Sequence, residues 1–283
     1  MRRILFAIVT IPWVSGCAGL FFQPYGNHIR TPAEIGLTFE DVAIKTQDAL
    51  ELHAWFLSVS TPTCATILFL HGNAENISTH IASVHWLPAR GFNVLLLDYR
   101  GYGSSDGTPS LAGFQLDIDA AVSYLLGRAD VDQSTLVVFG QSLGAATAIY
   151  YAAHGAHRSD IRGLVADSAF SGYRGIAREK MASFWLTWPF QWIPLLTVPT
   201  VYDPLAAVSG VSPIPLLLVH GDEDRIIPPA HSERLFAAAR EPKQFWKVEG
   251  AGHIEAFRSP AIRNRLVDYL RTNLCPTLPR AND

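Results

Sequence analysis

The stretch from Thr135 to Ala153 constrains the fold of this 283-residue chain more than any other. It reads TLVVFGQSLGAATAIYYAA, in which an apolar run stops at Gly140 and an Ala-rich segment follows Gly144. This is a Gly-x-Ser-x-Gly pattern with a strand predicted before it and a helix predicted after it. Such a sharp turn strains its central residue, and a side chain at either glycine would collide with a neighbouring element. The pattern favours Ser142 as a nucleophile beside a helix N-terminus, over a glycine turn with a capping serine.

Predicted strands and helices alternate from residue 37 to 274, which indicates one α/β domain with a mostly parallel sheet covered by helices on both faces. The first two strands, 37–46 and 50–59, are joined by a short turn and are expected to form an antiparallel edge. The other predicted elements are strands at 65–70, 93–97, 136–139, 161–166, 215–219 and 244–248, and helices at 76–90, 111–126, after Gly144, at 229–240 and at 255–274. Functional groups then belong at the carboxyl ends of the strands.

A catalytic serine needs a base within hydrogen-bond reach and an acid that orients the base. Ten histidines compete for the role of the base. His253 follows the last predicted strand in a Gly-Ala-Gly-His loop, and it completes the chain order serine, acid, histidine. By contrast, His53 lies in an early predicted strand away from any motif, and His28 lies in a segment that we expect to be exposed. His253 is therefore the predicted base.

The acid is predicted among carboxylates that follow core strands. Asp222, Glu223 and Asp224 directly follow one such strand, and Asp167 ends the strand before it. Because a triad aspartate must be partly buried and aimed at the imidazole, only one of the cluster can serve. An Arg-Ile-Ile-Pro-Pro segment follows Asp224 and is expected to fix its loop near the sheet. We favour Asp224, with Asp222 and Asp167 as alternatives.

An oxyanion formed in acyl transfer needs two donors, best supplied by backbone N–H groups that the fold already positions. One is expected from Leu143, directly after the nucleophile. The other is expected from Asn73, in the His-Gly-Asn-Ala loop after the 65–70 strand. Alone, this loop indicates only a glycine turn capped by asparagine, but together with the Ser142 turn it favours an oxyanion hole. No metal ion or cofactor is expected.

Five segments together resemble the α/β-hydrolase superfamily: HGNAEN at 71–76, DYRGYGSSDGTPS at 98–110, GQSLG at 140–144, HGDEDRIIP at 220–228 and GAGH at 250–253. They look like a branch of membrane-associated "α/β-hydrolase domain-containing" serine hydrolases, which includes protein depalmitoylases and esterases. The resemblance implies the α/β-hydrolase fold over residues 37–274 and, through its HG-x-x-D pattern, Asp224 as the acid. We expect a serine hydrolase that cleaves a carboxylic ester or thioester. A peptidase or amidase, or a non-catalytic binding protein with this fold, remains as an alternative.

Residues 168–208 interrupt the alternation and are expected to form an apolar lid or cap. The part from 181 to 202 contains no charged residue but carries three tryptophans and three internal prolines. A single transmembrane helix is disfavoured by those prolines. A buried helix pair is one alternative. The other is a lid that forms an apolar acyl pocket over Ser142 or touches a bilayer with its tryptophans.

The N-terminus has the three parts of a bacterial signal peptide: Arg2 and Arg3, an apolar run at 4–14, and Val-Ser-Gly before Cys17. The last part resembles a lipoprotein lipobox, so we expect residues 1–16 to be removed and Cys17 to be acylated. Residues 17–36 would then be a tether, and 275–283 a short tail. Because Ala18 is not aspartate, we expect the outer membrane, facing the periplasm, and we expect membrane contact through the lipid anchor.

Composition narrows the remaining possibilities. A formal net charge of −3 provides no basic patch of the kind that nucleic acid requires, so the expected partner is a small-molecule or lipid-like acyl substrate. A monomer is expected. Cys64 and Cys275 could pair in an oxidising periplasm. Because they flank distant predicted elements, free thiols are the favoured interpretation.

Overall fold

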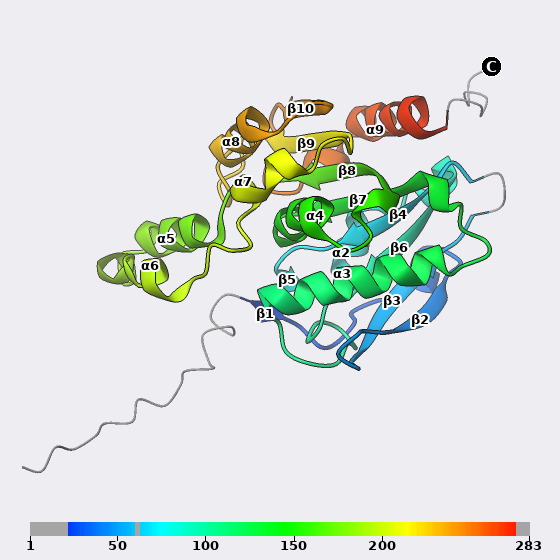
Figure 1. The fold of residues 1–283 in the computed structure, drawn as a ribbon, viewed down its shortest axis with the longest axis horizontal. Coiled ribbons are helices and arrows are strands. Elements are labelled where there is room, and N and C mark those ends of the chain that lie inside the picture. Colours follow the sequence, from blue (N-terminus) through cyan, green and yellow to red (C-terminus); the bar gives the residue numbers. More distant parts are fainter. Residues whose placement is uncertain (1–21, 60–62, 276–283) are drawn as a thin grey trace, which may run out of the picture.

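The computed structural model describes residues 22–59 and 63–275, which form an eight-stranded sheet with the strand order β10-β9-β8-β7-β4-β6-β3-β2 (Figure 1). β2 and β3 pair antiparallel, as do β3 and β6, and the other neighbours are parallel. The predicted sheet with its antiparallel edge is therefore confirmed. Its strands are β2 (Glu40–Lys45), β3 (Glu51–Leu57), β4 (Ala65–Leu70), β6 (Phe92–Leu97), β7 (Leu136–Gln141), β8 (Ile161–Asp167), β9 (Leu216–Gly221) and β10 (Lys243–Val248).

Two apolar layers enclose the sheet. One joins it to α3 (Leu111–Leu126), α4 (Leu143–His154) and α8 (Ala230–Ala238), and the other joins it to α2 (Ile77–His80) and α9 (Pro260–Leu274). Every residue of the central strands β4, β6, β7 and β9 is buried, as expected for strands with helices on both faces. This packing fixes the carboxyl ends of the strands along one edge.

The expected helix over 76–90 is wrong. Only α2 and two short 3₁₀ turns, Ile81–Ser83 and Pro88–Arg90, form there. Ser78 and Thr79 hydrogen-bond back to Asn76, which competes with helix propagation. Pro88 has no N–H to donate and so begins a new turn.

A disulfide joins Cys64 to Cys275, so the favoured interpretation of free thiols is wrong. Cys64 lies directly before β4, and Cys275 ends α9, which packs back across the sheet. Both cysteines are buried. The return of α9 brings together residues 211 positions apart, and no local sequence pattern encodes that return.

The beginning of the described chain contacts the core. β1 (Gln23–Pro24) pairs with β5 (Ala74–Glu75), in the loop after β4, and Phe22 packs edge-on against Phe114 with ring centroids 5.0 Å apart. Part of the predicted tether therefore lies against the carboxyl edge of the sheet. The predicted signal peptide and Cys17 lie outside the described residues.

Residues 168–208, which we call the cap, contain α5 (Tyr173–Ser183), a 3₁₀ turn (Trp188–Phe190), α6 (Ile193–Thr197) and α7 (Pro204–Ala207). Figure 1 shows α5 and α6 standing off from the sheet at one end of the molecule. A buried helix pair is wrong, because most large apolar side chains from 184 to 201 are exposed. In the described part of the chain, no helix combines the length and apolarity that a membrane span needs.

Candidate active site

The turn between β7 and α4 presents Ser142. Its backbone has φ 54° and ψ −112°, a strained conformation for a residue with a side chain. A Cβ added to Gly140 would lie 2.4 Å from the carbonyl oxygen of Gly144. A Cβ added to Gly144 would lie 2.1 Å from the carbonyl oxygen of Leu70. Only glycine fits at either position, so the tight approach of β7, α4 and β4 holds Ser142 at the sheet edge.

The structure brings Ser142, His253 and Asp224 into one hydrogen-bonded chain. The Ser142 hydroxyl lies 3.1 Å from His253 Nε2, and His253 Nδ1 lies 2.7 Å from Asp224 Oδ2. They come from the turn after β7, the loop after β10 and the loop after β9, 111 and 29 residues apart along the chain. In this arrangement the imidazole can accept the serine proton while the carboxylate holds the ring in place.

Asp224 is buried and receives several donors. Its Oδ1 accepts hydrogen bonds from the Ile226 and Ile227 N–H groups, both at 2.8 Å, and His220 Nε2 lies 3.2 Å from Oδ2. Burial alone would raise the pKa of Asp224, but hydrogen bonds with His220 and His253 outweigh burial and hold that pKa well below its ordinary value. The carboxylate therefore stays charged at neutral pH.

The alternative acids lie in other positions. Asp222 is exposed, and its carboxylate accepts a hydrogen bond from the Gly250 N–H group. Asp167 is buried at the end of β8, where the Gln141 side-chain amide donates to it. Burial raises the pKa of Asp167 to about 6. No described hydrogen bond joins either carboxylate to His253.

The two expected oxyanion donors belong to two segments that lie next to the nucleophile. Leu143 begins α4 directly after Ser142, and Asn73 lies in the loop after β4. A Cβ on Gly72 would lie 3.7 Å from the Ser142 Cβ, so this loop passes beside the nucleophile. The Tyr102 hydroxyl donates to the Asn73 carbonyl at 2.9 Å and lies 3.0 Å from its side-chain oxygen, which fixes the loop.

Asp98, at the end of β6, has no role predicted from the sequence, yet it organises this side of the site. It lies 2.8 Å from His28 Nε2 and 3.4 Å from His53 Nδ1, and it accepts a hydrogen bond from the Ile77 N–H group at the start of α2. The segment around His28 is exposed as expected, although the His28 side chain itself is only partly exposed. His53 contacts a motif residue, so the expectation that it lies away from the motifs is wrong. The network ties the first described residues and β3 to the segment that follows Asn73.

The network shifts the pKa values of Asp98 and His53. Burial alone would raise the pKa of Asp98, but hydrogen bonds from His28 and His53 outweigh burial and lower it to about 2. Burial alone would lower the pKa of His53, but Asp98 and Asp41 together outweigh burial and raise it. The ligand atoms of His28, His53 and Asp98 lie within 4.8 Å of one another, a grouping that could hold a metal ion. Hydrogen bonds within the network already account for its geometry.

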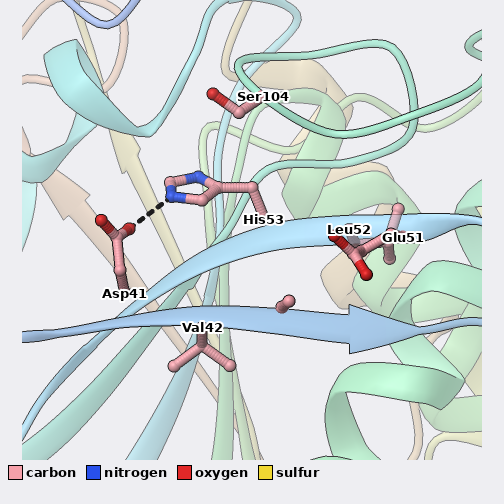
Figure 2. A pocket seen from close by; sticks show the side chains of 7 residues that line it. Asp41, Val42, Glu51, Leu52, His53 and Ser104 are labelled. Carbon is pink, nitrogen blue, oxygen red and sulfur yellow. Dashed lines mark hydrogen bonds and ion pairs between the residues drawn. The ribbon is translucent and has the colours of Figure 1, made fainter.

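Two cavities lie near these groups. A cleft of about 220 Å³ opens against His253 and is lined by residues that include Glu75, His80, Glu255 and Arg258. A cavity of about 250 Å³ lies on the β2–β3 edge instead, and Figure 2 shows His53 there with its ring directed to Asp41. Because only the first cavity contacts the Ser142–His253–Asp224 chain, it is the candidate substrate site.

The fold and this arrangement of side chains define the protein as an α/β-hydrolase. Residues 61–212 match the family described as "Serine aminopeptidase, S33". The chain is 38% identical over 245 residues to the uncharacterized protein YfhR of Escherichia coli K12, covering 84% of this chain and 82% of YfhR. It is 34% identical over 242 residues to the α/β-hydrolase domain-containing protein WAV2 of Arabidopsis thaliana, covering 81% and 77% of the two chains. The chain therefore belongs to this serine aminopeptidase family and is a hydrolase.

Solved structures show the same fold at lower sequence identity. The Pyrococcus furiosus esterase Pf2001 superposes with a TM-score of 0.70 at 22% identity, covering 90% of this chain and 98% of the esterase. The α/β-hydrolase GrgF from Penicillium superposes with a TM-score of 0.68 at 20% identity, covering 84% and 99% of the two chains.

Proposed function

We propose that the protein is a serine hydrolase that cleaves carboxylic esters or thioesters through an acyl-enzyme. The hydrogen-bonded chain from Ser142 through His253 to Asp224 carries this proposal. Ser142 Oγ attacks the acyl carbonyl while His253 Nε2 takes its proton, and the Leu143 and Asn73 N–H groups stabilise the oxyanion. His253 then protonates the leaving group. A water molecule releases the acyl group by the same steps.

We also propose that the reaction takes place at a membrane of the bacterial envelope. We propose that residues 1–16 are a signal peptide and that acylated Cys17 anchors the protein to the outer membrane on its periplasmic side. The described chain begins at the edge of the sheet that carries Ser142, because β1 pairs with β5. We propose that an anchor preceding β1 holds this edge close to the membrane, which would suit a lipid-like acyl substrate.

A fluorophosphonate probe tests the nucleophile. We expect the wild type to be labelled and Ser142→Ala to be unlabelled, with hydrolysis of 4-nitrophenyl butyrate reduced at least ~10³-fold and the melting temperature nearly unchanged. Ser123→Ala, which removes a hydroxyl on α3 that contacts His157, is the matched control and should behave as wild type. Labelling of Ser142→Ala would show that another residue is the nucleophile, and an unlabelled wild type would favour a non-catalytic binding protein.

A peptidase is the second candidate, favoured by the description of the matching family as a serine aminopeptidase. The cleft against His253 contains the carboxylates Glu75 and Glu255; Glu255 pairs with Arg258 at 2.7 Å, so Glu75 is the carboxylate that suits a substrate ammonium group. Comparison of 4-nitrophenyl esters with aminoacyl 4-nitroanilides on the same preparation decides between the two. Faster turnover of the anilides, lost in Ser142→Ala, would replace the ester proposal.

A further inference from the structure

The outer part of the cap, residues 184–201, exposes an unusual amount of apolar surface, and we call it the cap tip. Trp185 and Leu196 are 78% and 79% exposed, and ten of the fourteen exposed large apolar side chains in the described chain lie between 184 and 205. The others in the cap tip are Phe184, Leu186, Trp188, Phe190, Trp192, Leu195 and Val201. An apolar surface gathered in this way marks a contact site rather than ordinary surface scatter.

The tip is held by a fixed base. Tyr173, Ala177 and Val198 are buried, and the Arg174 guanidinium donates to the Val198 carbonyl at 3.0 and 3.1 Å. None of the exposed tip residues lines the cleft against His253. The exposed tip residues therefore lie outside the candidate substrate cleft, and the described cavities do not support the tip as an acyl pocket.

Charge around the tip favours an anionic partner surface. No residue from 181 to 202 is charged. The adjoining helix α5 carries Arg174, Arg178 and Lys180, against a single carboxylate, Glu179, which pairs with His231 at 2.9 Å. An uncharged aromatic tip next to a basic helix is the combination that binds the interface of an anionic bilayer.

The cap and the first described strand, β1, both start from the same edge of the sheet. The cap follows β8 and the first described strand pairs with β5, so both leave the carboxyl edge of the sheet, where Ser142 lies (Figure 1). Residues 1–21 precede that point and include the apolar run 4–14. A membrane reached by this segment would face the cap tip and the active-site edge together.

We propose that the cap tip docks into the interfacial region of an anionic lipid bilayer and turns the active-site edge toward it. Tryptophan suits this position because its ring is apolar and its N–H stays hydrated. Docking stands independently of the reaction. Its consequence, that the acyl substrate comes from the bilayer, rests on the proposed function.

Fluorescence quenching of the full chain tests the docking. The protein is mixed with phosphatidylglycerol–phosphatidylethanolamine vesicles whose acyl chains are brominated or unmodified. We expect brominated vesicles to quench the wild type, and Trp185→Phe/Trp188→Phe/Trp192→Phe to lose most of the quenching, because the described tryptophans outside the cap are buried. Trp13, outside the described residues, contributes equally to both proteins. Quenching that is unchanged in the triple variant, or absent from the wild type, would overturn the proposal.

A disruptive variant tests the consequence for activity. Trp185→Ser/Leu196→Ser should reduce hydrolysis of a long-chain 4-nitrophenyl ester embedded in vesicles about tenfold, yet leave 4-nitrophenyl acetate in solution within about twofold of wild type. Ile35→Ser, which changes an exposed apolar residue outside the cap, is the control and should alter the hydrolysis of neither substrate. Equal loss on both substrates would contradict a docking role.

Three further outcomes separate the explanations. If sedimentation shows a dimer that Trp185→Ser/Leu196→Ser dissociates, and brominated lipid does not quench, the tip is an interface between two copies and the bilayer proposal is wrong. Fluorophosphonate labelling without quenching would remove docking alone. Quenching without labelling would remove the proposed reaction and leave docking in place.

Discussion

The active-site edge of the sheet buries polar side chains, whereas the cap tip exposes apolar ones. At the edge, charged and polar side chains such as Asp98, Asp167 and Asp224 are buried, and each has described hydrogen bonds. At the tip, Trp185 and Leu196 are about four-fifths exposed. Buried polar groups need partners of fixed geometry, whereas exposed apolar groups need only a surface that removes water. The buried carboxylates of the edge therefore find their partners within one chain, whereas the apolar side chains of the tip leave water only when they contact another surface.

This difference predicts how each region responds to substitution. Changes at the edge should alter activity or pH dependence strongly, because the buried carboxylates of Asp98, Asp167 and Asp224 are each held by hydrogen bonds. Changes at the tip should leave the isolated protein nearly unaltered.

Asp224→Asn should have the largest effect, lowering kcat by about 10⁴-fold on a soluble ester. The asparagine oxygen can still accept the Ile226 and Ile227 N–H groups, but its NH₂ faces His253 and selects the wrong imidazole tautomer. Steady-state kinetics with a thermal melt measures the two effects separately. A loss below tenfold would show that Asp224 does not orient His253.

Asp167→Asn should stabilise the fold at high pH. The folded state raises the pKa of Asp167 from 3.8 to about 6, so the folded protein retains a proton that the unfolded chain releases. Stability is therefore lost as pH rises between 3.8 and about 6, and the amide removes a penalty on the order of 2–3 kcal/mol. Urea unfolding at pH 8 should show this gain, which should shrink toward pH 4.

The exposed carboxylate Asp268 on α9 gives the matched control, and Asp268→Asn should show no such gain. A destabilised Asp167→Asn variant at pH 8 would mean that the charged carboxylate contributes favourably to this edge.

Trp185→Ser or Leu196→Ser should have the smallest effect, below about 0.5 kcal/mol in the free energy of unfolding. Val198→Ala, at a buried apolar side chain within the tip segment, should cost about 2 kcal/mol because it removes two packed methyl groups. Denaturant unfolding of these variants without lipid makes the comparison. A costly tip substitution would show that the tip packs against its own chain.

The sequence predicts the sheet well because hydrophobic periodicity and the turn residues that end each element are local signals. β4 and α3 begin and end at the expected residues. As expected, a side chain at either glycine beside Ser142 would collide with the backbone of a neighbouring element. Ser142, Asp224 and His253 follow from motifs at strand ends, since parallel strands collect such ends at one edge.

The rest depends on contacts between distant segments. His28 and His53 reach Asp98 only because the first described residues and β3 lie against β6, and a histidine in a strand carries no mark of its partner. The cap is similar, because apolar composition describes a buried helix pair and an exposed tip equally well. Exposure is decided by tertiary packing.

The bond between Cys64 and Cys275 has a practical consequence for the cap. It closes a covalent ring that includes both the nucleophile turn and the exposed tip. A protease that nicks the tip would cut this ring once, and the two fragments would migrate together on a gel until a reductant is added.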